Sequence, residues 1–534
     1  MKRGGGKGHG RVGRLRRWAA GWGGVAGLLA VPGWAAAPVL EHLVPSGMAR
    51  GGSGMVEVVG NVDPWPARVW VEGAGVRFLA GTNTGRFQVE VDADAEPGVR
   101  LVRLHNDEGS SDPRFFVVGD GLEVDEVEPN DRPETAQVLD RLPVMVNGRL
   151  QPRGDTDGFA VRMAAGQWLE ARVDGYRLMS KLDPVLRLVT PEGRPLAWNH
   201  DFTSLDPRLV WQSPDDRTVV VQVFAFAYPA DAAIRLAGGA GAVYRLHVAV
   251  GTEPPDGEVG GEGWEEEPND SREMAPRRTL PIGVAGTIGQ AGDEDRFRFE
   301  GKAGETLEVR VAAAVLGSPL DAWVRVEEPG GRQLAYEDDT DGSPDPRLLW
   351  RVPEDGEYVV AVGSYVRRGG GAYRYRLTVE RVPPRYEVRS EAGAMVIEAG
   401  ATNTWKFRVT RQGGHTRTIA VDVRGLPEGV RALPATVPDG DGEGSVALVA
   451  DAGVKAFGGP VRLVANDGEA GGERGVPWML TSRGLNNGVP QGYTELVSDR
   501  TEALWLTVRG GTGAEDGGDE DQEKSVSGRV TASR

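Results

Sequence analysis

Short runs in which apolar and polar residues alternate recur along most of the chain. This period of two is typical of β-strands that pack one face on a core and expose the other to water. The clearest runs are residues 56–58, 68–71, 87–91, 168–173, 307–311, 405–409 and 419–423. Turns rich in glycine, proline and asparagine separate the runs. The sequence therefore predicts an all-β protein made of tandem β-sandwich domains.

An acidic motif occurs twice and marks an internal duplication. The sequence EVEPND at residues 126–131 returns as EEEPND at residues 265–270. The landmarks that follow also match in order: GDTDGF (154–159) with GDEDRF (292–297), Leu182-Asp183 with Leu320-Asp321, DPRL (206–209) with DPRL (345–348), and YRL (244–246) with YRL (375–377). Neither copy has a long apolar pattern of 3.6-residue period. We therefore expect two copies of one β domain of roughly 120 residues, a common domain size.

The rest of the chain divides around this pair. We predict an export signal at 1–37, β domains at 38–119, 120–250, 262–382 and 385–509, a linker at 251–261, and a disordered tail at 510–534. The signal assignment depends on basic residues up to Arg17, an apolar segment, and a small-residue cleavage pattern at Ala35-Ala36-Ala37. An uncleaved N-terminal anchor is the alternative. No later stretch is apolar enough to span a bilayer.

Composition narrows the chemistry. The 534 residues include no Cys and only 6 His, and the formal net charge is −17. Disulfides, zinc–thiolate sites and cysteine nucleophiles are excluded by the missing cysteine. An acidic body repels phosphate backbones, so nucleic acid is not an expected partner. The scattered histidines and the lack of a Gly-x-Ser-x-Gly motif argue against a hydrolase triad.

The acidic motifs are the candidate sites. If strand pairing brings each EPND motif near the acidic pair that follows it, five or six oxygen ligands converge. Close carboxylates repel one another unless a cation neutralises them, and Ca²⁺ takes six to eight oxygens in flexible geometry. We therefore predict calcium at Glu126, Glu128, Asn130, Asp131, Asp155 and Asp157, and again at Glu265, Glu267, Asn269, Asp270, Asp293 and Asp295. The alternative is solvated acids combined with Asn-Asp turn capping.

The repeated motifs also carry a family resemblance. Their order resembles the bacterial pre-peptidase C-terminal (PPC) domain, a β-sandwich of exported proteins. PPC-like collagen-binding domains hold calcium with an N-terminal acidic segment and a later acidic pair, which implies the same twelve residues. Residues 45–51, 95–100 and 115–119 resemble an immunoglobulin-like IPT/TIG domain, and Gly425–Val430 resembles a turn of secreted Ig-like modules.

Other polar and aromatic positions have structural interpretations. The segments Asn199-His200-Asp201 and Glu337-Asp338-Asp339, each followed by an Asp-Pro, are expected to be polar hairpins, with a shared ion site as the alternative. We expect Asp183 and Asp321 to hold loops. Most aromatic residues, Trp211 and Trp350 included, are expected in the cores, although rings on a sheet face could stack on sugars or grip an extended polypeptide.

These expectations define a function class. The sequence predicts an exported, non-catalytic binding or adhesion protein with calcium-stabilised PPC-like modules, acting in the periplasm, at the cell surface or outside the cell. The expected partner is an extracellular or envelope polypeptide or glycan. One alternative is a structural or assembly partner of a secreted enzyme or surface complex, and a second is a secreted hydrolase.

Overall fold

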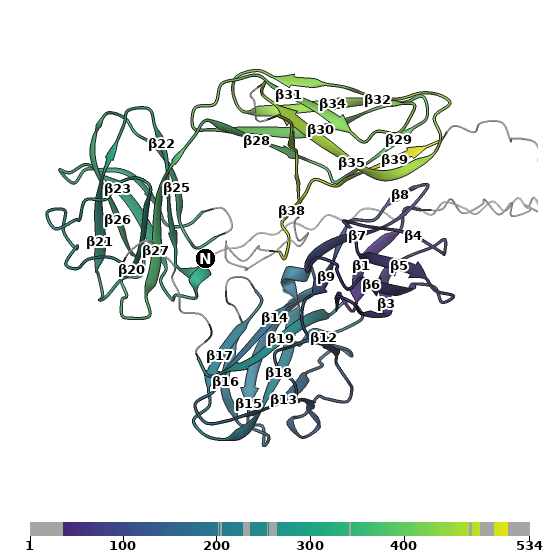
Figure 1. Cartoon of the computed structure of the whole chain (residues 1–534), viewed down its shortest axis with the longest axis horizontal. Coiled ribbons are helices and arrows are strands. Elements are labelled where there is room, and N and C mark those ends of the chain that lie inside the picture. Colours follow the sequence, from purple (N-terminus) through teal and green to yellow (C-terminus); the bar gives the residue numbers. More distant parts are fainter. Residues whose placement is uncertain are drawn as a thin grey trace, which may run out of the picture. The chain divides into compact units, whose positions relative to one another are not determined.

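The computed structural model of the protein describes residues 36–510, except 201, 203–204, 228–234, 254, 256–263, 341–342, 469–471 and 481–495 (Figure 1). The predicted signal up to residue 35, most of the predicted linker and the tail from residue 511 lie outside the described residues. Within the described part, the elements are β-strands and three short 3₁₀ helices. The prediction of an all-β protein of tandem sandwiches is confirmed. No described helix has the length and apolar character needed to cross a bilayer.

The first domain is a sandwich of two small antiparallel-rich sheets. Their strand orders are β1-β3-β6-β5 and β2-β9-β7-β4, with β8 beside β7. The bounds are β1 (Val39–Val44), β2 (Gly47–Ala49), β3 (Ser53–Asn61), β4 (Arg68–Val71), β5 (Val76–Ala80), β6 (Arg86–Val91), β7 (Gly98–Asn106), β8 (Gly109–Ser110) and β9 (Arg114–Gly119). Phe87 and Phe116 lie in the core between the two sheets.

The first repeat, residues 120–251, is a sandwich of two five-stranded sheets. The orders are β10-β12-β19-β14-β17 and β11-β13-β18-β15-β16. The bounds are β10 (Glu123–Asp125), η1 (Pro133–Thr135), β11 (Gln137–Leu139), β12 (Val144–Arg149), β13 (Asp157–Met163), β14 (Trp168–Asp174), η2 (Tyr176–Leu178), β15 (Leu182–Val189), β16 (Pro195–Asn199), β17 (Arg208–Gln212), β18 (Arg217–Ala227) and β19 (Val243–Gly251).

The second repeat, residues 264–382, has the same strand order in two four-stranded sheets. They are β20-β27-β22-β25 and β21-β26-β23-β24. Isolated bridges at Trp264 and Arg277 replace β10 and β11. The bounds are β20 (Ile282–Thr287), β21 (Glu294–Gly301), β22 (Thr306–Ala312), η3 (Ala314–Leu316), β23 (Ala322–Glu327), β24 (Gln333–Glu337), β25 (Arg347–Arg351), β26 (Gly356–Ser364) and β27 (Arg374–Val382).

The alternation of the sequence decides which residues form these cores. In β14, Leu169, Ala171 and Val173 are fully buried, while the residues between them are not. Trp350 lies in the core of the second repeat, and Trp211 packs against the core of the first, as predicted. The core strands β13 and β21 begin at the acidic pairs, so the apolar interior and the charged motif are adjacent in each repeat.

The last domain has two six-stranded sheets, β32-β34-β30-β28-β37-β38 and β29-β39-β35-β31-β33, with β36 beside β35. The bounds are β28 (Arg385–Ser390), β29 (Ala394–Glu398), β30 (Thr402–Gln412), β31 (Ile419–Arg424), β32 (Val430–Leu433), β33 (Ala435–Val437), β34 (Gly442–Ala450), β35 (Phe457–Asn466), β36 (Arg474–Gly475), β37 (Trp478–Met479), β38 (Arg500–Thr501) and β39 (Leu504–Arg509).

The Asp-Pro landmark has a role that the sequence did not reveal. The carboxylate of Asp206 accepts hydrogen bonds from the backbone N–H groups of Gly175, Tyr176 and Arg177, at 3.0, 2.7 and 2.8 Å. Asp345 does the same for residues 313–315 at the start of η3. Each aspartate satisfies donors at a helix start that the short helix cannot pair. Each aspartate therefore braces two connections between the sheets, the one that contains it and the one that contains the short helix.

Replacing this brace is expected to destabilise the first repeat. Asp206→Ala leaves three N–H donors in a buried turn without their acceptor, which we expect to lower its free energy of unfolding by about 2–3 kcal/mol. Calorimetry of the whole chain would measure this as a lower melting temperature for one transition. The exposed Asp140→Ala is the control. Equal melting of the two variants would contradict the brace.

Candidate metal centre

Each EPND loop is tied to the first residues of a core strand. The carbonyl oxygen of Asn130 accepts the N–H of Gly158 in β13 (3.1 Å), and that of Asn269 accepts the N–H of Arg296 in β21 (3.2 Å). Within the loop, the Glu128 carboxylate accepts the N–H of Asn130 at 2.9 Å, and Glu267 repeats this bond with Asn269 at 3.0 Å. The loop thus folds back over the acidic pair that begins the strand.

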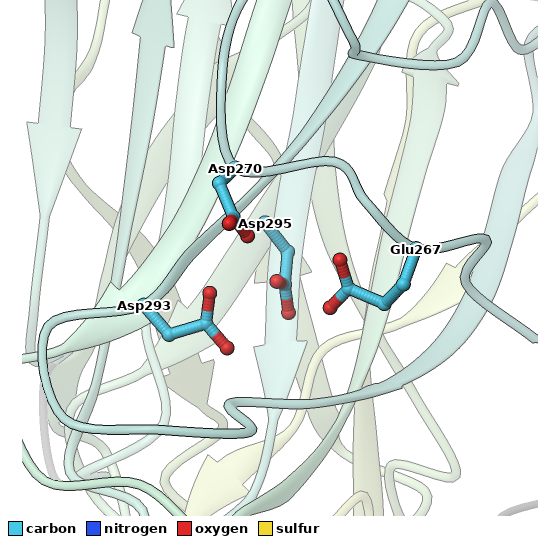
Figure 2. A group of neighbouring side chains, drawn as sticks. All are labelled: Glu267, Asp270, Asp293 and Asp295. Carbon is cyan, nitrogen blue, oxygen red and sulfur yellow. The ribbon is translucent and has the colours of Figure 1, made fainter.

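This folding brings four carboxylates together in the second repeat. Glu267, Asp270, Asp293 and Asp295 each place an oxygen within 4.8 Å of the others. Their side chains converge on one space, with two coming from the loop and two from the start of β21 (Figure 2). In the first repeat the corresponding group is Glu128, Asp131 and Asp155. The EPND motif thus meets both members of the acidic pair in the second repeat, but only Asp155 of the pair in the first repeat.

Two predicted ligands have a different role. Glu126 accepts the N–H of Arg149 (2.9 Å) and the hydroxyl of Tyr244 (3.1 Å), and Glu265 accepts the N–H of Thr287 (2.7 Å) and the hydroxyl of Tyr375 (3.2 Å). Neither glutamate belongs to the carboxylate groups found among the described residues. They fasten the loop to the opposite sheet. The tyrosine of the YRL landmark is the partner that sequence reasoning missed.

The most buried members of the site lack protein partners. Asp295 and Asn269 are completely buried, and within the described residues neither carboxylate oxygen of Asp295 and neither amide atom of Asn269 has a hydrogen-bond partner. In the first repeat the Asn130 amide and the Oδ1 of Asp157 also have no partner among the described residues, but the Oδ2 of Asp157 accepts the hydroxyl of Tyr244 at 2.5 Å. Buried polar atoms are normally paired because leaving them unpaired costs free energy. These oxygens therefore fit a bound cation.

Burial also perturbs the acidity of the site. Burial, with the neighbouring Glu126 carboxylate, raises the pKa of Asp157 to about 10, while burial and Glu265 raise the pKa of Asp295 to about 9. Burial likewise raises the pKa of Glu128, Asp155, Glu267 and Asp293. The cause is the cost of placing several negative charges in a poorly hydrated space. Protons or a bound cation would therefore stabilise the folded site relative to the fully charged one.

The donor set selects the kind of cation. Every atom of the two groups is a carboxylate oxygen, which suits a hard cation and not a thiolate- or imidazole-binding metal. The four carboxylates of Glu267, Asp270, Asp293 and Asp295 fit Ca²⁺, which accepts many oxygens in a flexible arrangement, better than Mg²⁺. In the first repeat, Glu128, Asp131 and Asp155 are the equivalent ligands, with Asp157 at the strand start behind them.

The second acidic segment, predicted to be a hairpin, instead connects the two sheets of each repeat, because β16 and β17 lie in different sheets and so do β24 and β25. The side-chain oxygen of Asn199 accepts the N–H of Arg208 at 3.1 Å and thereby joins β16 to β17. In the second repeat the hydroxyl of Thr340 accepts the N–H of Arg347 at 2.6 Å. Asp201 lies outside the described residues, and Asp338 and Asp339 are not part of a carboxylate group among the described ones.

Comparison with known proteins gives limited similarity. No protein-family model matches the chain. A stretch of 103 residues is 35% identical to a probable subtilase-type serine protease of Deinococcus radiodurans, covering 18% of this chain and 14% of that protein. The chain thus spans about a seventh of the length of this relative.

Solved structures match at low similarity. The pre-peptidase C-terminal domain of a collagenase from Bacillus anthracis is 16% identical, with 20% of this chain and 94% of that domain covered and a TM-score of 0.17. The four N-terminal Ig domains of Dscam1 are 11% identical, with 88% and 99% covered and a TM-score of 0.20.

The acidity of the site predicts an unusual pH dependence without metal. Folded Asp157 and Asp295 keep their protons until about pH 10 and 9, whereas the unfolded chain releases them near pH 4. Their contribution to stability is therefore full below about pH 4 and is lost as pH rises towards 9. In chelator, we expect the melting temperature to fall between pH 5 and pH 8.

The variant Asp157→Asn/Asp295→Asn should flatten this slope and melt higher than the parent at pH 8 in chelator, because the neutral amides remove the buried charges. Calorimetry at several pH values would measure both effects. Exposed Glu300→Gln serves as the control. A parent and a double variant with the same slope would contradict the assignment.

Proposed function

We propose that this chain is an exported, non-catalytic binding protein whose two repeats are PPC-like modules stabilised by Ca²⁺. The observation that carries the proposal is the pair of carboxylate groups in equivalent positions, each in a loop whose asparagine, Asn130 or Asn269, is completely buried with an amide oxygen that has no partner among the described residues. A ligand that binds only the folded state stabilises it by mass action. A cation can therefore replace the disulfides that a chain without cysteine cannot form.

The export part of the proposal depends on the N-terminal sequence. Basic residues, an apolar segment and Ala35-Ala36-Ala37 have the order of a signal peptide. An exported module with millimolar calcium around it needs only modest affinity to be occupied, since extracellular modules bind in the range of about 10⁻⁴–10⁻³ M. The expected partner is an extracellular or envelope polypeptide or glycan.

Calcium is expected to raise the melting temperature of the repeats. At a calcium concentration of about 100 times Kd, the gain is about 2.7 kcal/mol for each occupied site. Calorimetry of the chain without residues 1–37, in calcium and in chelator, measures it. Asp131→Ala/Asp270→Ala should lose the response, because both residues are exposed members of the carboxylate groups and their removal leaves the cores intact.

The control is Glu300→Ala, an exposed glutamate on β21 outside the group, which should respond to calcium like the parent. Magnesium at the same concentration should give a smaller rise. Equal melting of the parent in calcium and in chelator would refute the metal sites and leave the EPND loops as turns held by their own hydrogen bonds.

A second candidate is an assembly partner of a secreted enzyme. The observation that favours it is the similarity of 103 residues to a segment of a probable subtilase-type protease. Modules of this kind would then act by docking beside a separate catalytic chain. Co-purification of one protease with the whole chain, with no retention of polymer, would favour this candidate over the binding protein.

A further inference from the structure

An aromatic cluster lies outside the core of the second repeat. In β23 the core residues are Ala322, Val324 and Val326, so Trp323 points to the opposite, outer face of the sheet. It is paired in register with Gly363 on β26. A Cβ at Gly363 would lie 2.3 Å from the Trp323 ring, so the ring lies directly over the glycine. The missing side chain lets the indole lie flat on the sheet.

Two tyrosines extend this surface. The Tyr336 ring of β24 lies beside Trp323, with centroids 6.2 Å apart and an interplanar angle of 29°. Tyr365, directly after β26, is 60% exposed, and Tyr336 is 39% exposed. We call Trp323, Tyr336 and Tyr365 the aromatic platform. The guanidinium of Arg325 lies over the Trp323 ring at 4.6 Å, and Trp323 is only 8% exposed. The rings of the platform that a ligand can reach are therefore those of the two tyrosines, and the buried Trp323 packs beside Tyr336.

The first repeat has the same kind of surface, made from different residues. Register places Trp198 opposite Arg187, as Tyr336 is opposite Arg325. In the first repeat, Phe224 of β18 lies opposite Val185 of β15. In the second repeat the aromatic residue is on the strand that corresponds to β15: Trp323 of β23 lies opposite Gly363 of β26.

The cation and the exposed rings recur as well. Arg187 lies over the Phe224 ring at 5.1 Å. Trp198 is 64% exposed and Phe226, in the position that matches Tyr365, is 42% exposed. The ring that the arginine covers lies on β23 in the second repeat and on β18 in the first. In both repeats an arginine lies over this ring and exposed aromatic side chains lie beside it. A requirement on the outer face itself explains this exchange better than core packing does.

A groove beside the platform contains both hydrogen-bond donors and hydrogen-bond acceptors. It has a volume of about 290 Å³ and is lined by the platform together with Glu294, Arg325, Ser364 and Arg367. Gly292 and Asp293 also line it, so the groove borders the candidate metal centre. Glu294 already pairs with Arg325 at 2.9 Å, which fixes both side chains at the groove wall. Hydrogen-bond donors and acceptors thus surround aromatic faces.

These features match the chemistry of a sugar ring. A pyranose has an apolar face of C–H groups that packs on an aromatic ring, and a rim of hydroxyls that both donate and accept hydrogen bonds. The mixed charges of the wall suit an uncharged ring better than an anion. The volume lies at the small end for ligand sites, enough for one or two sugar rings. A proline-rich chain also stacks on tyrosines, but it has no side-chain hydroxyls for Glu294 and Arg325.

We propose that the outer face of the β21-β26-β23-β24 sheet binds pyranose units of a neutral polysaccharide on the aromatic platform, and that the face bearing Trp198 in the first repeat is a second, weaker contact. This inference rests on the binding function proposed above and specifies its ligand class. Two such faces on one chain would strengthen binding to a polymer through effective concentration.

The test is affinity electrophoresis of the whole chain without residues 1–37, in calcium, through gels containing xylan, glucomannan, a soluble β-glucan or dextran. We expect at least one polysaccharide to retard the parent. Tyr336→Ala/Tyr365→Ala should weaken that interaction about tenfold or more, since each stacked ring contributes roughly 0.5–1.5 kcal/mol. Adding Trp198→Ala should weaken it further.

Matched variants separate stacking from folding. Tyr336→Phe/Tyr365→Phe keeps both rings and should retain most of the binding, and Trp264→Ala removes an exposed ring that lies off the platform. Calorimetry should show unchanged melting and an unchanged calcium response for every variant. Retardation that the alanine double variant leaves intact would overturn the inference.

Two further results of the binding test would contradict the polysaccharide proposal. Failure of all four polysaccharides to retard the parent, or capture of a proline-rich peptide with no polysaccharide binding, would overturn the inference. In either case a calcium-dependent rise in melting temperature would leave the proposed metal-stabilised modules standing, whereas its absence would remove them independently.

Discussion

The main constraint on each repeat is a completely buried carboxylate at the beginning of a core strand. Asp157 and Asp295 start the strands β13 and β21, whose next inward residues are core phenylalanines. The strand cannot enter the apolar interior without placing this acid in a poorly hydrated space. Protons or a cation must compensate the charge, because isolated buried carboxylates are among the most costly groups in a protein.

The surrounding structure is organised around that requirement. The EPND loop covers the acid and contributes further oxygens, while Glu126 and Glu265 tie the loop to the opposite sheet through Tyr244 and Tyr375. Glu126 and Glu265 therefore fasten the loop, while Glu128 and Glu267 belong to the converging carboxylate groups. This division explains why the motif has acids at two alternate positions before the proline.

The two repeats share their buried hydrogen bonds and differ on the outer face of one sheet. They share the loop bonds and the aspartate that braces a short helix, which satisfy backbone N–H groups, and the tyrosine anchor, which joins two side chains. The outer face is built differently: a tryptophan over Gly363 in one repeat, and Phe224 opposite a valine in the other. Buried hydrogen bonds constrain residue identity, whereas an exposed surface constrains only the shape and chemistry it presents.

The sequence alone determined the all-β class, the duplication and the two groups of acidic residues, because a period of two and a repeated motif are local in the chain. Tertiary structure decided which acids converge. It separated Glu265 from the group formed by Glu267, Asp270 and Asp293, since Tyr375 arrives from a strand more than a hundred residues later. It also decided that Trp323 faces outward, because only strand pairing places Gly363 beneath its ring. The hydrophobic pattern decides which face of a strand is buried, but it does not decide which distant strand pairs with it, and these contacts depend on that pairing.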